Sequence, residues 1–132
     1  MGVENMKKKV LLVDDAAFMR MMLKKVLEEL NFEIVAEAKS GKEAVRLYNQ
    51  YKPDLVTMDL SMPEMDGIEA TARIIEKDPQ AKIVICSALG QKRKIIESVK
   101  AGAKDYILKP FDKANVYRKI RNLVNLEGNY RI

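Results

Sequence analysis

The stretch VTMDLSMPEMDG, residues 56–67, predicts a buried strand that ends in a carboxylate and turns into a helix. Residues 56–58 combine β-branched and apolar side chains, which is typical of a strand interior. Pro63 and the acid-glycine pair that closes the stretch are turn residues, so we expect the strand to end at Asp59. Residues 67–77 then show helical spacing of apolar positions. The stretch therefore indicates a strand-to-helix unit with an acid at its junction.

The same alternation runs through the rest of the chain. We expect strands at about 10–13, 33–38, 54–59, 81–87 and 104–109, and helices at about 19–30, 42–51, 67–77, 91–101 and 112–124. Five strands alternating with five helices predict an α/β, doubly wound fold in which helices cover both faces of a parallel sheet. We expect one domain over residues 1–132, with a core at about 8–125, a short N-terminal arm and a frayed C-terminal tail.

Composition indicates the cellular compartment of the protein and the ligand atoms that a metal site could use. The chain of 132 residues contains no histidine and one cysteine, Cys86, within an apolar run. These residues exclude a disulfide framework and the usual zinc sites, so a metal ion would need oxygen ligands. The N-terminal residues lack the apolar core of a signal peptide, and no apolar run approaches the length of a membrane helix. We expect a cytoplasmic, monomeric protein without membrane contact.

Positive charge is concentrated in the last third of the chain. Residues 91–132 carry 11 basic and 4 acidic side chains, a net charge of +7, whereas the whole chain has a net charge of +5. The basic residues are scattered over helical positions without interleaved aromatic residues or a DNA-binding motif, which argues against nucleic acid. A solvated face or a docking face for an acidic partner is the better interpretation.

Polar side chains follow several of the expected strands. Asp14 and Asp15 end the first strand, Asp59 the third, Ser87 the fourth and Lys109 the fifth. Parallel strands bring their carboxyl ends to one edge of a sheet, where ligands bind in such folds. Three acids placed together repel one another unless a cation is present, and oxygen ligands suit Mg²⁺. The bland alternative is that the acid pair only caps a helix.

These motifs together resemble the receiver domain of two-component response regulators across essentially the whole chain. The motifs are the acid pair in LLVDDAA (11–17), DLSMPEMDG (59–67), Ser87-Ala88, and Lys109-Pro110 in YILKPF (106–111). Single-domain chemotaxis regulators are the most similar members. The resemblance implies a flavodoxin-like (βα)5 fold with strand order 2-1-3-4-5, which the periodicity alone does not give. It also implies a cis Lys109-Pro110 bond, although base rates favour trans.

The resemblance assigns chemical roles to the residues at the strand ends. Asp59 would accept a phosphoryl group from a chemotaxis histidine kinase. Mg²⁺ would be held by Asp15, Asp59 and the backbone carbonyl of Ser61, with Asp14 acting through water. Lys109 would supply a second positive charge close to one of the phosphoryl oxygens. Such a protein is a signalling switch rather than a conventional enzyme, since it catalyses its own phosphorylation and dephosphorylation.

The resemblance also implies a route from phosphorylation to output. Ser87 and the backbone N–H of Ala88 would bind the phosphoryl group, and Tyr106 would then rotate from exposed to buried. The output face would comprise the helix at 91–101, the strand at 104–109 and the helix at 112–124. Its basic rim would be Lys92, Arg93, Lys94, Lys100, Lys113, Arg118, Lys119 and Arg121, and its inward side chains Ile95, Ile96, Val99, Val116, Ile120, Leu123 and Val124. A flagellar or archaellar motor-switch protein, or an adaptor, would read that face, and a phosphatase is a further partner.

The same residues also suggest three other interpretations. A phosphorelay intermediate that passes its phosphoryl group to a histidine phosphotransfer protein would use the same site. A flavin carrier on the same fold is disfavoured because acidic loops replace a phosphate cradle. A calcium loop at 59–70 is rejected, since Pro63 and Ala70 occupy positions that need oxygen ligands. Ser61 and Leu89 stand where side chains influence the lifetime of the acyl phosphate in this family.

Overall fold

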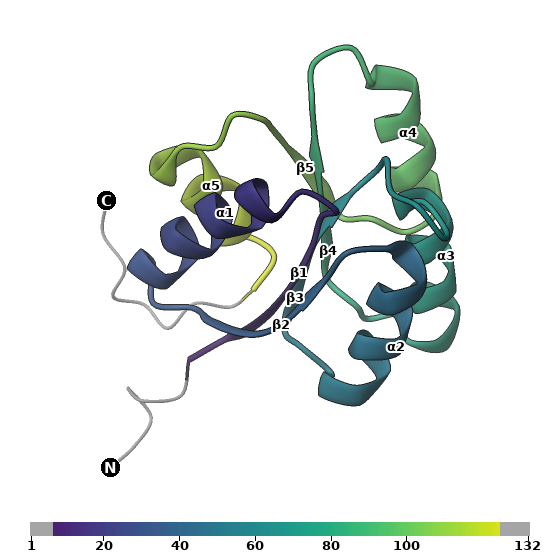
Figure 1. Ribbon diagram of the computed structural model, residues 1–132, viewed down its shortest axis with the longest axis horizontal. Helices are drawn as coiled ribbons and strands as arrows, with labels where there is room; N and C mark the ends of the chain where they lie inside the picture. The colour runs from purple at the N-terminus through teal and green to yellow at the C-terminus, as the bar shows by residue number, and fades with distance from the viewer. Residues whose placement is uncertain (1–6, 125–132) are drawn as a thin grey trace.

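A computed structural model describes residues 7–124 as a parallel five-stranded sheet between two helical layers (Figure 1). The strands are β1 (Lys9–Val13), β2 (Glu33–Ala38), β3 (Leu55–Asp59), β4 (Ile83–Ser87) and β5 (Asp105–Leu108). The helices are α1 (Ala17–Glu29), α2 (Gly41–Tyr51), α3 (Gly67–Lys77), α4 (Lys92–Lys100) and α5 (Lys113–Ile120). The sheet order β2-β1-β3-β4-β5 confirms the predicted doubly wound fold.

The helices divide between the faces of the sheet as the strand order requires. Figure 1 shows α1 and α5 on one face, and α2, α3 and α4 on the other. Successive residues of β1 join opposite cores: Leu11 packs toward α2 and α3, whereas Leu12 packs toward α1 and α5. All five residues of β3 and of β4 are buried. Burial on both faces explains why these strands are apolar along most of their length.

Helix starts differ in their capping. Ser40, Asp66 and Asp112 precede α2, α3 and α5, and each side chain accepts a hydrogen bond of 2.8 to 3.1 Å from the backbone N–H three residues on. Such caps stabilise a helix by about 1 kcal/mol each. Among the described residues, Ala16 before α1 and Gln91 before α4 provide no side-chain cap. The two uncapped helices begin beside the strand ends that carry the acids and the serine.

The inward face predicted for α4 is partly wrong. Ile96 and Val99 are 48% and 47% exposed, whereas Ser98 is fully buried and its hydroxyl donates to the carbonyl of Ile95 at 2.6 Å. The strand beside α4, β5, is at the edge of the sheet, so the sheet covers only part of the apolar stripe. Helix α5 is also shorter than predicted, because residues 121–124 form turns after Ile120.

Other predictions made for the ends of the chain lie outside the described residues. The proposed N-terminal arm falls largely in 1–6, and the proposed C-terminal tail falls in 125–132. None of the helices within residues 7–124 combines the length and the apolar character that a membrane span needs.

Candidate phosphoacceptor and metal site

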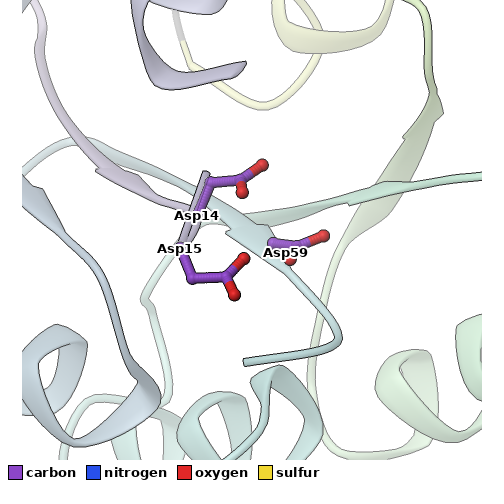
Figure 2. A group of neighbouring side chains, drawn as sticks. All are labelled: Asp14, Asp15 and Asp59. Carbon is purple, nitrogen blue, oxygen red and sulfur yellow. The ribbon is translucent and has the colours of Figure 1, made fainter. Parts of the chain in front are cut away.

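Three carboxylates meet at the carboxyl edge of the sheet. Asp14 and Asp15 follow β1, and Asp59 is the last residue of β3. Figure 2 shows the three side chains directed into one space, and one carboxylate oxygen from each lies within 4.8 Å of the others. Asp14 and Asp59 are only 7% and 8% exposed, whereas Asp15 is exposed. The sheet therefore gathers the acids that the sequence placed at separate strand ends.

Backbone and side-chain hydrogen bonds fix the first acid. Asp14 donates its N–H to the carbonyl of Ala38 at 3.0 Å, and its carboxylate accepts from the N–H of Ala16 at 2.9 Å. Arg20 donates to the carbonyl of Asp14 at 2.6 Å and to Glu37 at 2.9 Å. Neither acid of the pair is the N-cap residue of α1, so helix capping alone does not account for them.

A glycine allows the chain to return close to the third acid. The N–H of Gly67 donates to the carbonyl of Leu60 at 2.9 Å. A Cβ atom at Gly67 would lie 2.0 Å from the backbone oxygen of Asp59, a distance that no side chain can adopt. The start of α3 is thus packed directly against the end of β3, and only glycine permits that approach.

Helix α2 holds the intervening loop from the side. Glu64 and Met65 adopt left-handed backbone angles, with φ of 51° and 85°. Their carbonyl groups accept hydrogen bonds from the first turn of α2: Gly41 donates to Met65 at 2.9 Å, and Lys42 donates to Glu64 at 3.0 Å. A Cβ atom at Gly41 would lie 2.1 Å from the Met65 oxygen. This close packing fixes the loop that follows Asp59.

One ammonium group lies among the acids. Lys109 Nζ is 3.0 Å from Asp14 Oδ2 and 3.2 Å from Asp59 Oδ1. The Lys109-Pro110 bond is cis, as the resemblance implied, and the N–H of Lys109 donates to the carbonyl of Ser87 at 2.8 Å. Burial acts to lower the pKa of Lys109, but hydrogen bonding and attraction to Asp14 and Asp59 outweigh it and raise the pKa. The lysine is therefore charged at neutral pH.

The electrostatics of Asp59 are unfavourable to its ionised form. Burial and the charge of Asp14 raise its pKa above the ordinary value of 3.8, and the lowering effect of Lys109 only partly opposes them. The acids outnumber the ammonium group, so the cluster carries a net charge of −2 when all are ionised. A divalent cation would neutralise that charge, and carboxylate oxygens are ligands that Mg²⁺ prefers. The residues present thus fit a hard metal ion.

A glutamine that the sequence reasoning missed lies beside Ser87 and Ala88. Ser87 is fully buried, and its hydroxyl lies 2.8 Å from Gln91 Oε1 and 3.0 Å from the carbonyl of Ala88. The N–H of Ala88 donates to the same Gln91 oxygen at 3.2 Å. Gln91 Nε2 donates to Ser61 Oγ at 3.4 Å. Gln91 ends the segment CSALGQ (86–91), but the sequence assigns it no role, because its hydrogen-bond partners are identified only by the fold.

Tyr106 is partly exposed at the predicted output face. The residue is 37% exposed, and its ring lies under Lys119, whose Nζ is 4.4 Å from the ring centroid and 3.2 Å from Asp105. A hollow of about 320 Å³ opens between α4 and β5 beside the ring. Apolar side chains line most of it, namely Leu89, Ile95, Ile96 and Leu108.

Comparison with known proteins identifies the family. The family model for the response regulator receiver domain matches residues 10–121. The chain belongs to the receiver domain family. It is 52% identical to the chemotaxis protein CheY of Thermotoga maritima over 89% of this chain and 98% of that protein. It is also 52% identical to CheY of Bacillus subtilis, over 89% of this chain and 98% of that protein.

A solved structure extends the comparison to an assembly. The CheX-CheY-BeF3-Mg²⁺ complex of Borrelia burgdorferi matches this receiver domain with a TM-score of 0.85 and 33% identity, over 93% of this chain and 94% of the matched chain. The identification of a CheY-like chemotaxis receiver, made from the sequence motifs, is confirmed. A receiver of this type is a signalling switch.

The structure brings together most of the side chains that the sequence nominated. Asp14, Asp15, Asp59 and Lys109 form one cluster. Ser87 ends the neighbouring strand, and its carbonyl is bonded to the lysine backbone. Tyr106 and Leu89 lie together at the hollow beside α4.

Proposed function

We propose that this receiver domain is switched by phosphorylation of Asp59 in a chemotaxis pathway. The observation that carries the proposal is the position of the Asp59 carboxylate, which is nearly buried, 3.2 Å from Lys109 and within 4.8 Å of the other two acids. A carboxylate can attack the phosphorus of a phosphohistidine on the kinase. The P–N bond then breaks, an acyl phosphate forms on Asp59, and the imidazole leaves with the electron pair.

The surrounding residues would position the reaction. Asp15, Asp59 and the carbonyl of Ser61 would hold Mg²⁺, with Asp14 acting through a water molecule. Bound Mg²⁺ offsets charge on the transferring phosphoryl oxygens. Lys109 would donate to one of those oxygens, and its contact with Asp14 keeps the ammonium group at the site before the reaction.

Ser87 and Ala88 would bind another phosphoryl oxygen and connect the site to output. The Ser87 hydroxyl and the Ala88 N–H lie at the end of β4, next to β3 in the sheet. Rotation of Tyr106 toward β4 would remodel the hollow beside α4 and the α4-β5-α5 face. We propose that a motor-switch protein or an adaptor in the cytoplasm binds this face. The Borrelia relative is solved in a complex with CheX, which supports direct binding of this receiver to another protein. A phosphatase is a further partner that we propose.

Phosphorylation can be tested with a small donor. Acetyl phosphate should add one phosphoryl group to the protein in the presence of Mg²⁺, and peptide mapping should place it on Asp59. The matched control is Asp59→Asn, which keeps the size of the side chain and removes the nucleophile. Modification of that variant, or modification undiminished by a chelator, would contradict the assignment.

A phosphorelay role is the alternative, because it would use the same site. Incubation of the phosphorylated receiver with a histidine phosphotransfer domain separates the two functions. A switch should retain its phosphoryl group on Asp59 until hydrolysis, whereas a relay protein should pass it rapidly to the histidine. The exposed hollow and Tyr106 favour the switch.

A further inference from the structure

The Gln91 amide bridges three groups around the candidate phosphorylation site. Its oxygen accepts from Ser87 Oγ at 2.8 Å and from the Ala88 N–H at 3.2 Å, and its nitrogen donates to Ser61 Oγ at 3.4 Å. Ser61 lies in the loop after β3 and Ser87 is the last residue of β4, so this half-buried side chain connects the ends of two strands. The proposed phosphorylation mechanism gives Gln91 no role.

The chemistry of the neighbours fixes the orientation of the amide. The Ala88 N–H can only donate, so the atom that faces it must be the amide oxygen rather than the NH₂ group. The Ser87 hydroxyl has one proton, and its two acceptors, Gln91 Oε1 and the Ala88 carbonyl, are alternatives. The shorter contact is with the glutamine. The Gln91 oxygen is therefore the acceptor shared by both donors.

We propose that Gln91 is an internal competitor of the phosphoryl group. This inference rests on the proposed function, in which Ser87 and the Ala88 N–H bind a phosphoryl oxygen. The same two donors are engaged by the Gln91 amide oxygen. Each donor has one proton to give, so the amide must leave before the phosphoryl oxygen can take both hydrogen bonds. Gln91 is thus a positioning residue that acts through Ser87 and Ala88.

Displacement of Gln91 would also reach the output face. Gln91 is the residue immediately before α4, and its carbonyl accepts the first hydrogen bond of that helix, from the N–H of Ile95 at 2.9 Å. Gln91 and Ile95 both line the hollow beside Tyr106. A backbone adjustment that releases the amide therefore alters the first turn of α4 and the shape of the hollow together.

Three variants test the competition. Gln91→Ala removes the amide, and Gln91→Met keeps the length of the side chain without the acceptor. Gln50→Ala, an exposed position near the end of α2, is the matched control for loss of a glutamine side chain. Loss of two neutral hydrogen bonds that compete with the ligand should tighten binding by at least about fivefold. Beryllofluoride with Mg²⁺, a phosphoryl analogue, is the probe.

Two measurements are expected to agree. In amide NMR spectra recorded without metal or beryllofluoride, the Ala88 N–H resonance should move upfield in both Gln91 variants and stay in place in Gln50→Ala. In titrations with beryllofluoride and Mg²⁺, both Gln91 variants should show the lower apparent Kd, while Gln50→Ala should match the wild type. The NMR measurement reports the hydrogen bond from the Ala88 N–H to Gln91 directly, because neither metal nor beryllofluoride is present.

The outcomes separate this inference from the proposed function. If the wild type binds no beryllofluoride and accepts no phosphoryl group from acetyl phosphate, the proposed function fails, and the competition fails with it. If the wild type binds and both Gln91 variants bind with unchanged affinity, the competition alone is refuted. An unmoved Ala88 resonance also refutes it. If the Gln91 variants lose the phosphoryl group more slowly but bind beryllofluoride with unchanged affinity, Gln91 acts in hydrolysis of the acyl phosphate. That result would refute the proposed competition.

Discussion

Replacement of Asp59 by asparagine should stabilise the metal-free protein, because the cluster holds more negative than positive charge. Asparagine keeps the shape of the side chain and an acceptor oxygen for Lys109. It removes one carboxylate from the three that lie within 4.8 Å. Lys109 retains Asp14 as an ionic partner at 3.0 Å, so the substitution does not leave an unpaired ammonium group.

The size of the effect follows from the distances. With an effective dielectric constant of about 20, repulsion between two carboxylates at 4.8 Å, the upper limit of the separations in the cluster, is about 3.5 kcal/mol. Attraction between Lys109 and Asp59 at 3.2 Å is about 5 kcal/mol. Asp15 is exposed, so its repulsion is weaker, about 1 to 2 kcal/mol. These charges nearly cancel, and the cost of burying the Asp59 carboxylate remains. We expect a gain of about 1 to 2 kcal/mol in the free energy of unfolding.

Denaturant unfolding with and without Mg²⁺ measures this gain. Mg²⁺ at about ten times its dissociation constant should stabilise the wild type by about 1.4 kcal/mol and stabilise the asparagine variant much less. The pH dependence has a definite sign. The pKa of Asp59 is raised in the folded state, so the wild type loses stability as pH rises above about 3.9 until Asp59 is ionised, and the asparagine variant lacks that loss. A variant less stable than the wild type at neutral pH without metal would refute the reasoning.

Four further substitutions or reagents give distinct outcomes. Lys109→Arg should still be phosphorylated by acetyl phosphate, but its partner affinity in surface binding should no longer rise with phosphorylation. The reason is that a planar guanidinium cannot replace the point charge of the ammonium group. An unchanged rise in affinity would count against a role of Lys109 in the switch. Reversal of the exposed Lys92 and Lys94 to glutamate should slow association in stopped-flow experiments up to about tenfold and flatten its salt dependence. Tyr106→Ala should reduce the phosphorylation-dependent gain in affinity without changing the salt slope, and harmless results from both changes would move the output surface elsewhere. Burial raises the pKa of the Cys86 thiol to about 12, so thiol reagents should modify it only at the rate of unfolding, and rapid modification of the native protein would contradict its burial.

Much of the site could be predicted because parallel strands place their carboxyl ends on one edge. Asp14, Asp59 and Lys109 are far apart in the sequence, yet each follows or ends an apolar run. Periodicity located those runs, so the convergence of the side chains followed from the fold class. The order of the strands did not follow from periodicity. Pairing depends on contacts between distant segments, and the correct order came from the resemblance to receivers.

The remaining features depend on local environment that the sequence pattern does not contain. Ile96 and Val99 have helical spacing typical of a buried face, but α4 packs beside an edge strand and leaves them half exposed. Ser98 is polar, yet it is buried because its hydroxyl bonds to the carbonyl of Ile95. Gln91 was overlooked because an amide in a loop carries no signal until its donors are located.

The uneven capping of the helices gives the domain a gradient of local stability. A first turn held by a side-chain cap resists opening by about 1 kcal/mol more than an uncapped one, which corresponds to roughly a fivefold difference in the open population. Helices α2 and α3, whose first turns brace the loop after Asp59, begin with such caps. Within the part of the chain that the structure describes, α4 begins without one and buries few side chains. Fluctuation is thereby favoured at the start of α4, on the output face, while the loop after Asp59 stays closed during the same excursions.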